Sequence, residues 1–158
     1  MIKSLAAAAL ICFLLIFSNR SYSQITAGGR FYTSFDNTKI YYEASGDGYP
    51  VILIHGFSGT SQGWKSGQMY GDLIKAGYKV IILDQRGNGK SDKPHTDEGY
   101  NNDAEAKDIM GLATALNLKS YDAVGYSRGS IILSRLLVLD KRLHKAVMGG
   151  MGADYTNP

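Results

Sequence analysis

The segment that decides the fold is GYSRGS, residues 125–130, in which a serine stands between two glycines. An apolar run, residues 121–124, leads into this segment, and a second apolar run, residues 131–133, follows it. The first run predicts a buried strand, and the second predicts an apolar helix. A serine on so sharp a strand-to-helix turn takes a strained backbone, and its neighbours two positions away must be small to avoid collisions. Gly125 and Gly129 meet that requirement.

Ser127 is the residue of this segment with a chemical use. At a helix N-terminus, free N–H groups and the helix dipole favour negative charge. The turn would therefore present a nucleophile together with half of an oxyanion hole. The alternative is a glycine-rich turn whose serine caps the helix. The G-x-S-x-G pattern alone does not separate these interpretations, but a preceding strand and a following helix are the context that the catalytic motif requires.

The rest of the chain predicts a hairpin followed by alternating strands and helices. Residues 29–34 and 39–44 are rich in aromatic and β-branched side chains and flank a turn, which is typical of a hairpin. Continuous apolar runs predict strands buried on both faces. These strands cover residues 51–54, 79–83 and 121–124, and residues 145–148 predict a fourth strand. Helices are expected at residues 68–76, 101–118 and 127–139, the second of them capped by Asn102 or Asp103. Such alternation predicts an α/β fold, a mostly parallel sheet with helices on both faces.

The start of the chain has the layout of a secretory signal peptide. A positive charge precedes an unbroken apolar run of 13 residues at 5–17, and residues 21–23 give a small-residue cleavage pattern. We expect residues 1–23 to be removed and residues 24–158 to form one domain of an exported protein, periplasmic or secreted, without stable membrane association. An uncleaved membrane anchor is the alternative. Removal of this leader also removes Cys12, the only cysteine, so we expect no disulfide.

Composition and charge favour an ordinary globular domain. The sequence is 44% hydrophobic and 20% charged, with a formal net charge of +3. Its basic residues form no run or stripe of the kind that binds nucleic acid. No cluster of His, Cys, Asp and Glu has the spacing of a metal site, and no phosphate-binding loop motif is present. These absences predict no nucleic-acid partner, no metal and no cofactor.

Three motifs follow three successive predicted strands. His55-Gly56 follows the first strand, DQRGNGKS at residues 84–91 follows the second, and GYSRG at residues 125–129 follows the third. In this order and spacing the chain resembles the α/β-hydrolase superfamily, of the AB hydrolase-1 type. The resemblance covers residues 31–150.

The resemblance implies roles for the residues of these motifs. Ser127 is the expected nucleophile, and the backbone N–H groups of Phe57 and Arg128 are the expected oxyanion donors. The motif residues with expected structural roles are His55, Gly56, Asp84, Ser91, Gly125 and Gly129. Arg86 is expected to be structural as well, since it lies in the glycine-rich loop. Trp64 either lines the pocket or packs in the core.

A serine hydroxyl needs a base to remove its proton, and the resemblance implies an acid and then a histidine after Ser127. His144 is the only histidine in that part of the chain, and it precedes a strand, at the wrong end of the sheet. Like His95, it is expected at the surface. Asp154 follows the last predicted strand and is the candidate acid. No residue of the chain is a plausible histidine base.

The resemblance therefore implies that the chain is the N-terminal part of a longer hydrolase, through a fragment, a frameshift or a premature stop. The histidine, the usual acid and any cap would lie beyond Pro158. The last predicted strand, residues 145–148, is then expected to form an exposed apolar edge.

The function implied by the resemblance is that of a serine hydrolase that transfers the acyl group of a small carboxylic ester to water. A cofactor-free perhydrolase or haloperoxidase is one alternative. An inactive fragment or a binding protein of the same fold is the other.

Overall fold

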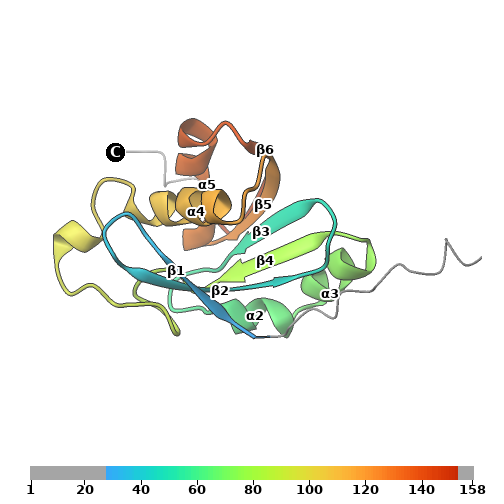
Figure 1. Cartoon of the computed structure of the whole chain (residues 1–158), viewed down its shortest axis with the longest axis horizontal. Coiled ribbons are helices and arrows are strands. Elements are labelled where there is room, and N and C mark those ends of the chain that lie inside the picture. Colours follow the sequence, from blue (N-terminus) through green and yellow to red (C-terminus); the bar gives the residue numbers. More distant parts are fainter. Residues whose placement is uncertain (1–27, 153–158) are drawn as a thin grey trace, which may run out of the picture.

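The computed structural model describes residues 28–152, which contain a six-stranded sheet with helices on both faces (Figure 1). The strands are β1 (Arg30–Thr33), β2 (Lys39–Ser45), β3 (Pro50–Ile54), β4 (Lys79–Leu83), β5 (Tyr121–Tyr126) and β6 (Leu143–Gly149). The helices are α2 (Ser61–Lys65), α3 (Gln68–Lys75), the 3-10 turn η1 (Asp97–Gly99), α4 (Ala104–Ala115) and α5 (Arg128–Leu139). The predicted leader and Asp154 lie outside the described residues. Within residues 28–152, no helix has the length and apolarity of a membrane span.

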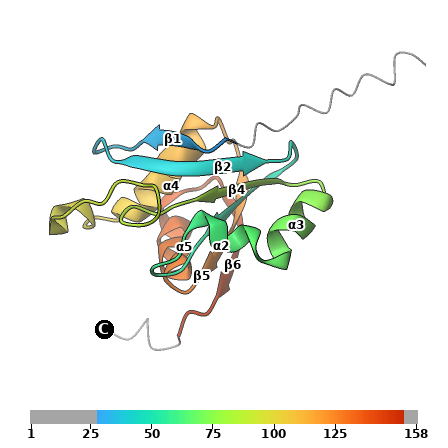
Figure 2. The same cartoon turned by 90° about the horizontal axis from the view of Figure 1, so that it is seen from below.

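The sheet has the strand order β1-β2-β4-β3-β5-β6. Strands β4, β3, β5 and β6 run parallel, whereas β1 and β2 form an antiparallel hairpin that joins the sheet through β4. Helices α2 and α3 cover one face, and α4 and α5 cover the other, as the two views in Figures 1 and 2 show. The expected α/β fold, with its N-terminal hairpin and mostly parallel sheet, is confirmed. The carboxyl ends of β3, β4 and β5 lie at one edge of this sheet, where ligands bind in such folds.

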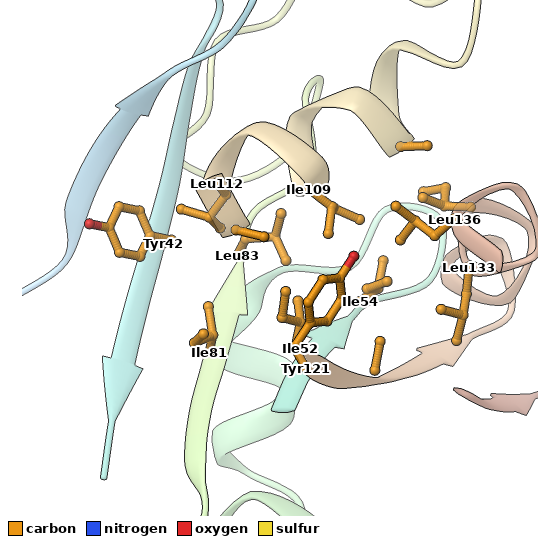
Figure 3. Close-up of a cluster of buried hydrophobic side chains, with 14 of the residues drawn as sticks. Tyr42, Ile52, Ile54, Ile81, Leu83, Ile109, Leu112, Tyr121, Leu133 and Leu136 are labelled. Atoms are coloured by element: carbon orange, nitrogen blue, oxygen red, sulfur yellow. The ribbon is translucent and has the colours of Figure 1, made fainter. Parts of the chain in front are cut away.

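The larger core lies between the sheet and helices α4 and α5 (Figure 3). Its central side chains are Ile52, Ile54, Ile81, Leu83, Ile109, Leu112, Leu133 and Leu136. Each such side chain stabilises the fold by about 1.5–3 kcal/mol relative to exposure. On β3 the alternate residues Val51 and Leu53 point to the opposite face and form a second core with Val80 and Ile82. Strand β3 is therefore buried on both faces, as its unbroken apolar run predicts.

Sequence patterning misses the short helix α2. Its five residues include a glycine and only one large apolar side chain, Trp64, so they carry no helical periodicity. The helix is held instead by a distant contact, because the Ser61 N–H donates to Asp84 Oδ1 at 2.6 Å. Trp64 then packs against the second core, beside α3.

Helix α4 is shorter than the expected 101–118. Asn102 and Asp103 have positive φ angles of 55° and 60°, and Asn117 has a φ of 55°, so left-handed residues flank the helix at both ends. Asp103 does hold the N-cap position, but its side chain makes no capping hydrogen bond. Its carboxylate accepts a hydrogen bond from Arg135 Nε at 2.6 Å. Asp103 therefore occupies the predicted N-cap position, but it does not form the predicted capping hydrogen bond.

The strand expected at residues 145–148 is β6, and it is largely exposed. Val147 and Met148 are 57% and 42% exposed, because β6 pairs only with β5 and lies at the edge of the described sheet. The neighbouring end of α5 also exposes Leu137 and Val138. The predicted exposed apolar edge is confirmed.

A buried arginine holds the loop after β4 in place. The Nε and Nη2 atoms of Arg86 each donate to a carboxylate oxygen of Asp108, both at 2.7 Å, and Nη1 donates to Asp36 at 2.8 Å. Arg86 Nη1 also donates to the carbonyl of Gly99. Desolvation raises the pKa of Asp36, but hydrogen bonds from Arg86 and Thr38 outweigh it and lower this pKa to about 2. The network joins the hairpin turn, the loop after β4 and helix α4.

We expect Asp108→Asn to destabilise the fold by about 3–5 kcal/mol, because it removes one partner of a buried ion pair and leaves Arg86 undercompensated. Urea unfolding followed by circular dichroism measures this change in the free energy of unfolding. Asp103→Asn is the control, since it breaks the exposed pair with Arg135 and is expected to cost less than about 1 kcal/mol. Equal losses in the two variants would contradict the proposed importance of the Arg86 network.

Candidate functional site

Ser127 lies at the turn that joins β5 to α5, at the carboxyl edge of the parallel strands. Its backbone has a φ of 51° and a ψ of −118°, a region that residues with side chains rarely occupy. Two hydrogen bonds hold the turn: the Ser127 N–H donates to the Gly149 carbonyl at 2.7 Å, and the Ser130 N–H donates to the Ser127 carbonyl at 2.9 Å. Strain of this kind costs about 1–3 kcal/mol, so the surrounding structure must impose it.

Gly125 and Gly129 are required because the backbone passes too close for a Cβ atom. A Cβ on Gly125 would lie closer than 3.0 Å to the Gly129 carbonyl. A Cβ on Gly129 would lie closer than 3.0 Å to the carbonyl of Ile54 in β3. The sequence pattern predicts both collisions: one between positions 125 and 129, and one between position 129 and the adjacent strand. Ser130, which sequence reasoning missed, also holds this corner by donating from Oγ to the Gly125 carbonyl at 2.8 Å.

The two residues that carry the expected oxyanion donors, Phe57 and Arg128, are in side-chain contact. The Arg128 guanidinium carbon is 5.7 Å from the centroid of the Phe57 ring, although the residues are 71 positions apart in the sequence. Arg128 is the first residue of α5, where a backbone N–H has no partner within the helix. Neither amide donates a hydrogen bond to another described residue. Both residues line the same hollow as Ser127.

Ser127 lines an open hollow of about 430 Å³, which we call the serine hollow; its lining residues are Phe57, Glu105, Ser127, Arg128 and Ile131. Glu105, in the first turn of α4, pairs with Arg128, whose Nη2 lies 2.9 Å from Glu105 Oε1. Sequence reasoning missed Glu105, because its partner is 23 positions away and no motif includes it. The wall of the hollow thus carries one cation and one anion next to the serine.

A second hollow of about 320 Å³ adjoins the first, with Phe57 in the wall of both. Its other aromatic walls are Trp64 and Tyr126, so it suits an apolar group. The sequence leaves open whether Trp64 lines the pocket or packs in the core. In the structure Trp64 does both, since it lines this hollow and packs against the second core. Its indole Nε1 is buried and has no hydrogen-bond partner among the described residues.

His55 is engaged through both ring nitrogens. Its Nε2 accepts a hydrogen bond from the Gln85 N–H at 3.0 Å. Nδ1 therefore carries the proton and donates to the Gly56 carbonyl at 2.7 Å. Burial lowers the pKa of His55 below its ordinary value, against the opposing effect of the Gly56 hydrogen bond and of the Asp84 charge. A neutral imidazole with no free nitrogen ties two loops together and is not placed to act as a base.

Asp84 and Ser91 also make contacts inside the structure. Asp84 accepts hydrogen bonds from the N–H of Ser61 at 2.6 Å and from the N–H of Lys90 at 2.8 Å. The Ser91 hydroxyl donates to the Asp84 carbonyl at 2.6 Å and accepts from the Tyr41 N–H at 2.8 Å. These bonds attach the loop after β4 to α2 and β2. Both side chains are buried, away from a substrate.

The remaining histidines lie away from Ser127. His144 is at the amino end of β6, the opposite end of the sheet, where its Nδ1 lies 3.3 Å from Asp122 Oδ1. His95 is exposed in the loop between β4 and α4. Asp154, the candidate acid, is outside the described residues. Between residues 28 and 152, no group of three or more His, Cys, Asp or Glu could hold a metal ion.

Comparison with known proteins gives consistent matches. A family model described as alpha/beta hydrolase fold matches residues 49–150. A Synechocystis sp. protein assigned to the non-heme chloroperoxidases is 40% identical over 111 residues, covering 69% of this chain and 39% of that protein. A non-heme chloroperoxidase of Streptomyces lividans is 34% identical, covering 73% and 42%. Among solved structures, an esterase of Exiguobacterium antarcticum is 33% identical with a TM-score of 0.72, covering 80% and 46%. The chain thus spans about two fifths of the length of these curated relatives.

We expect Ser127→Gly to be more stable than Ser127→Ala by about 1 kcal/mol, because glycine relieves the strained backbone and alanine keeps it. Chemical denaturation of the two variants measures the difference. The control is Ser130, inside α5, where glycine is expected to be less stable than alanine by about 1 kcal/mol. The same order at both positions would argue against strain at Ser127.

We expect the free energy of unfolding to fall as the pH is lowered from 7.5 to 5, by up to about 1.4 kcal/mol per pH unit. The lowered pKa keeps His55 neutral in the folded state, while the unfolded chain takes up a proton below about 6.5, which favours unfolding. In His55→Gln this part of the pH dependence is lost, and in His95→Gln it is kept. An unchanged pH profile of unfolding in His55→Gln would contradict a buried neutral imidazole.

Proposed function

The chain belongs to the alpha/beta hydrolase fold family, and we propose that it carries the nucleophile and oxyanion donors of a cofactor-free acyl-transfer enzyme. The observation that supports this most is the strained turn at Ser127, in a hollow that Phe57 and Arg128 also line. Because the chain spans about two fifths of the length of its curated relatives, the activity of the whole protein is part of the proposal.

In the proposed reaction, Ser127 Oγ attacks the carbonyl carbon of a small carboxylic ester and forms a serine–acyl bond. The carbonyl oxygen becomes an oxyanion that accepts hydrogen bonds from the Phe57 and Arg128 amides, which stabilises the transition state. A base takes the proton of the Ser127 hydroxyl as this bond forms and passes it to the ester oxygen, which leaves with the bonding electron pair. None of the histidines among residues 28–152 has a free ring nitrogen beside Ser127, so the proposal assigns the relay of this proton to none of them.

We favour hydrogen peroxide as the acyl acceptor. Peroxide attacks the acyl-serine, the serine leaves as its hydroxyl, and a peracid is released. The peracid then transfers its terminal oxygen to a halide, giving a carboxylic acid and a hypohalous acid after uptake of one proton. Support comes from relatives named non-heme chloroperoxidase that align with the larger part of this chain. The open hollows of about 430 and 320 Å³ suit a small acyl donor.

Water as the acceptor is the second candidate, and it would make the enzyme an ester hydrolase. The 33% identity to an esterase structure favours it, and so does the apolar hollow walled by Phe57, Trp64 and Tyr126. The two candidates share every step up to the acyl-serine and differ only in the molecule that attacks it. A binding protein without turnover would share the hollows but not the acyl-serine.

We expect a fluorophosphonate probe to form a covalent bond to Ser127 with loss of fluoride. Free imidazole, supplied as an external base, is expected to raise the labelling rate by about tenfold or more, since general-base catalysis accelerates such steps by about 10²–10⁴. Peptide mass spectrometry locates the label. Ser127→Ala is expected to remain unlabelled, while Ser134→Ala, on the same helix, is expected to label like the parent chain. No labelling of folded chain at saturating imidazole would refute the nucleophile assignment.

The acceptor is identified with the same chain, imidazole and a simple acetate ester. Halogenation of monochlorodimedone that needs peroxide, halide and Ser127 supports the peroxide reaction. Acid release that needs Ser127 but is unaffected by peroxide supports the hydrolase instead. Labelling of Ser127 without either product would show that the chain does not turn over the ester, and would favour the alternative of a binding protein.

A further inference from the structure

The residue after the nucleophile is an arginine whose side chain lines the serine hollow. Arg128 Nε donates to Glu105 Oε1 at 3.0 Å, and its Nη2 lies 2.9 Å from the same oxygen. The guanidinium also lies over the face of Phe57. Among the described residues, no hydrogen-bond acceptor contacts Nη1 of Arg128. The Nε–Nη2 edge of the guanidinium therefore pairs with Glu105, while the Nη1 donors have no acceptor among the described residues.

Arg86 of the same chain shows what such a guanidinium can bind. Its Nε and Nη2 edge is taken by Asp108, as that of Arg128 is taken by Glu105. Its Nη1 then binds a second carboxylate, that of Asp36, at 2.8 Å. One carboxylate on the Nε–Nη2 edge thus leaves a guanidinium able to bind another through Nη1, and such charge-assisted hydrogen bonds are about twice as strong as neutral ones.

The other charges at the serine hollow permit a second carboxylate near Arg128. Glu105 is the only acidic residue in its lining, and its charge is already engaged with the far edge of the guanidinium. His55, behind the adjoining hollow, is kept neutral and adds no charge. Arg128 has a third of its side chain exposed, so a ligand reaches it without the full cost of burying a charge.

We propose that Arg128 determines substrate specificity by binding a carboxylate on the substrate through Nη1. The preferred acyl donor is then a half-ester of a short dicarboxylic acid, with its ester carbonyl at Ser127 and its free carboxylate on Arg128. Phe57 and Ile131 contact the carbon chain between them. The inference rests on the proposed acyl-transfer function, because it names the substrate class of that same hollow.

The test measures binding and does not depend on turnover. Monomethyl glutarate and its neutral counterpart, dimethyl glutarate, are titrated separately into the ¹⁵N-labelled chain, and the backbone amide signals of Phe57, Ser127 and Arg128 are followed by NMR. We expect the half-ester to bind at least about tenfold more tightly than the diester, a difference of about 1.4 kcal/mol. Arg128→Gln is expected to abolish this preference.

Two further variants make the outcome specific to Arg128. Arg135→Gln removes another α5 arginine, paired with Asp103 of the residues preceding α4, and is expected to keep the preference. Glu105→Gln leaves the guanidinium but removes the competing carboxylate, so it is expected to tighten binding of the half-ester about threefold or more. Equal affinity for the two esters, a preference that survives Arg128→Gln, or weaker binding in Glu105→Gln would each overturn the proposal.

The result is separable from the test of the proposed function. Fluorophosphonate labelling with no carboxylate preference would leave the acyl-transfer function in place and refute the role of Arg128. A carboxylate preference that depends on Arg128 in a chain whose Ser127 does not react would leave a carboxylate-binding hollow and refute the nucleophile.

Discussion

The close approach of the Gly129 backbone to the carbonyl of Ile54 is the constraint on which the site depends. Because no side chain separates α5 from β3 at this point, the helix begins directly beside the end of the neighbouring strand. Its first residue, Arg128, is thereby brought to the loop after β3, where its guanidinium lies over the ring of Phe57. A single backbone-to-backbone contact therefore positions Ser127 and the two residues that carry the candidate oxyanion donors. Only glycine at position 129 permits this contact.

The strain at Ser127 persists because the elements around it cannot yield. Strand β3 is buried on both faces, and moving it would disturb two apolar cores whose side chains contribute about 1.5–3 kcal/mol each. On the other side, the Gly149 carbonyl accepts the Ser127 N–H, and Ser130 bonds to the Gly125 carbonyl. Against these contacts, a local strain of about 1–3 kcal/mol is small. The sheet thus imposes the geometry of the turn, and the turn sets where helix α5 begins.

Elements with a long apolar signal could be predicted from the sequence, and those held by single distant contacts could not. The runs in β3 and β4 predict strands because alternate side chains enter two cores. Helix α2 has no such run and depends on Asp84, 23 positions from the amide of Ser61. Strand β6 has the composition of an internal strand, so its position at the edge of the described sheet is not encoded locally. The same holds for the site: G-x-S-x-G identifies Ser127, whereas Glu105 enters the site only through its pairing with Arg128.

The chain uses the same guanidinium chemistry in two environments with different consequences. Arg86 is fully buried, so its donors must all be paired, and two carboxylates and a carbonyl pair them. Arg128 is partly exposed, and water can satisfy the donors that Glu105 does not. A ligand carboxylate therefore displaces water there and breaks no protein contact. Arg128 then has two roles in the proposed reaction. Its backbone N–H stabilises the oxyanion, and its side chain selects the substrate from which that oxyanion forms. In this proposal, recognition and chemistry are coupled through one residue, whose place is fixed by the glycine that follows it.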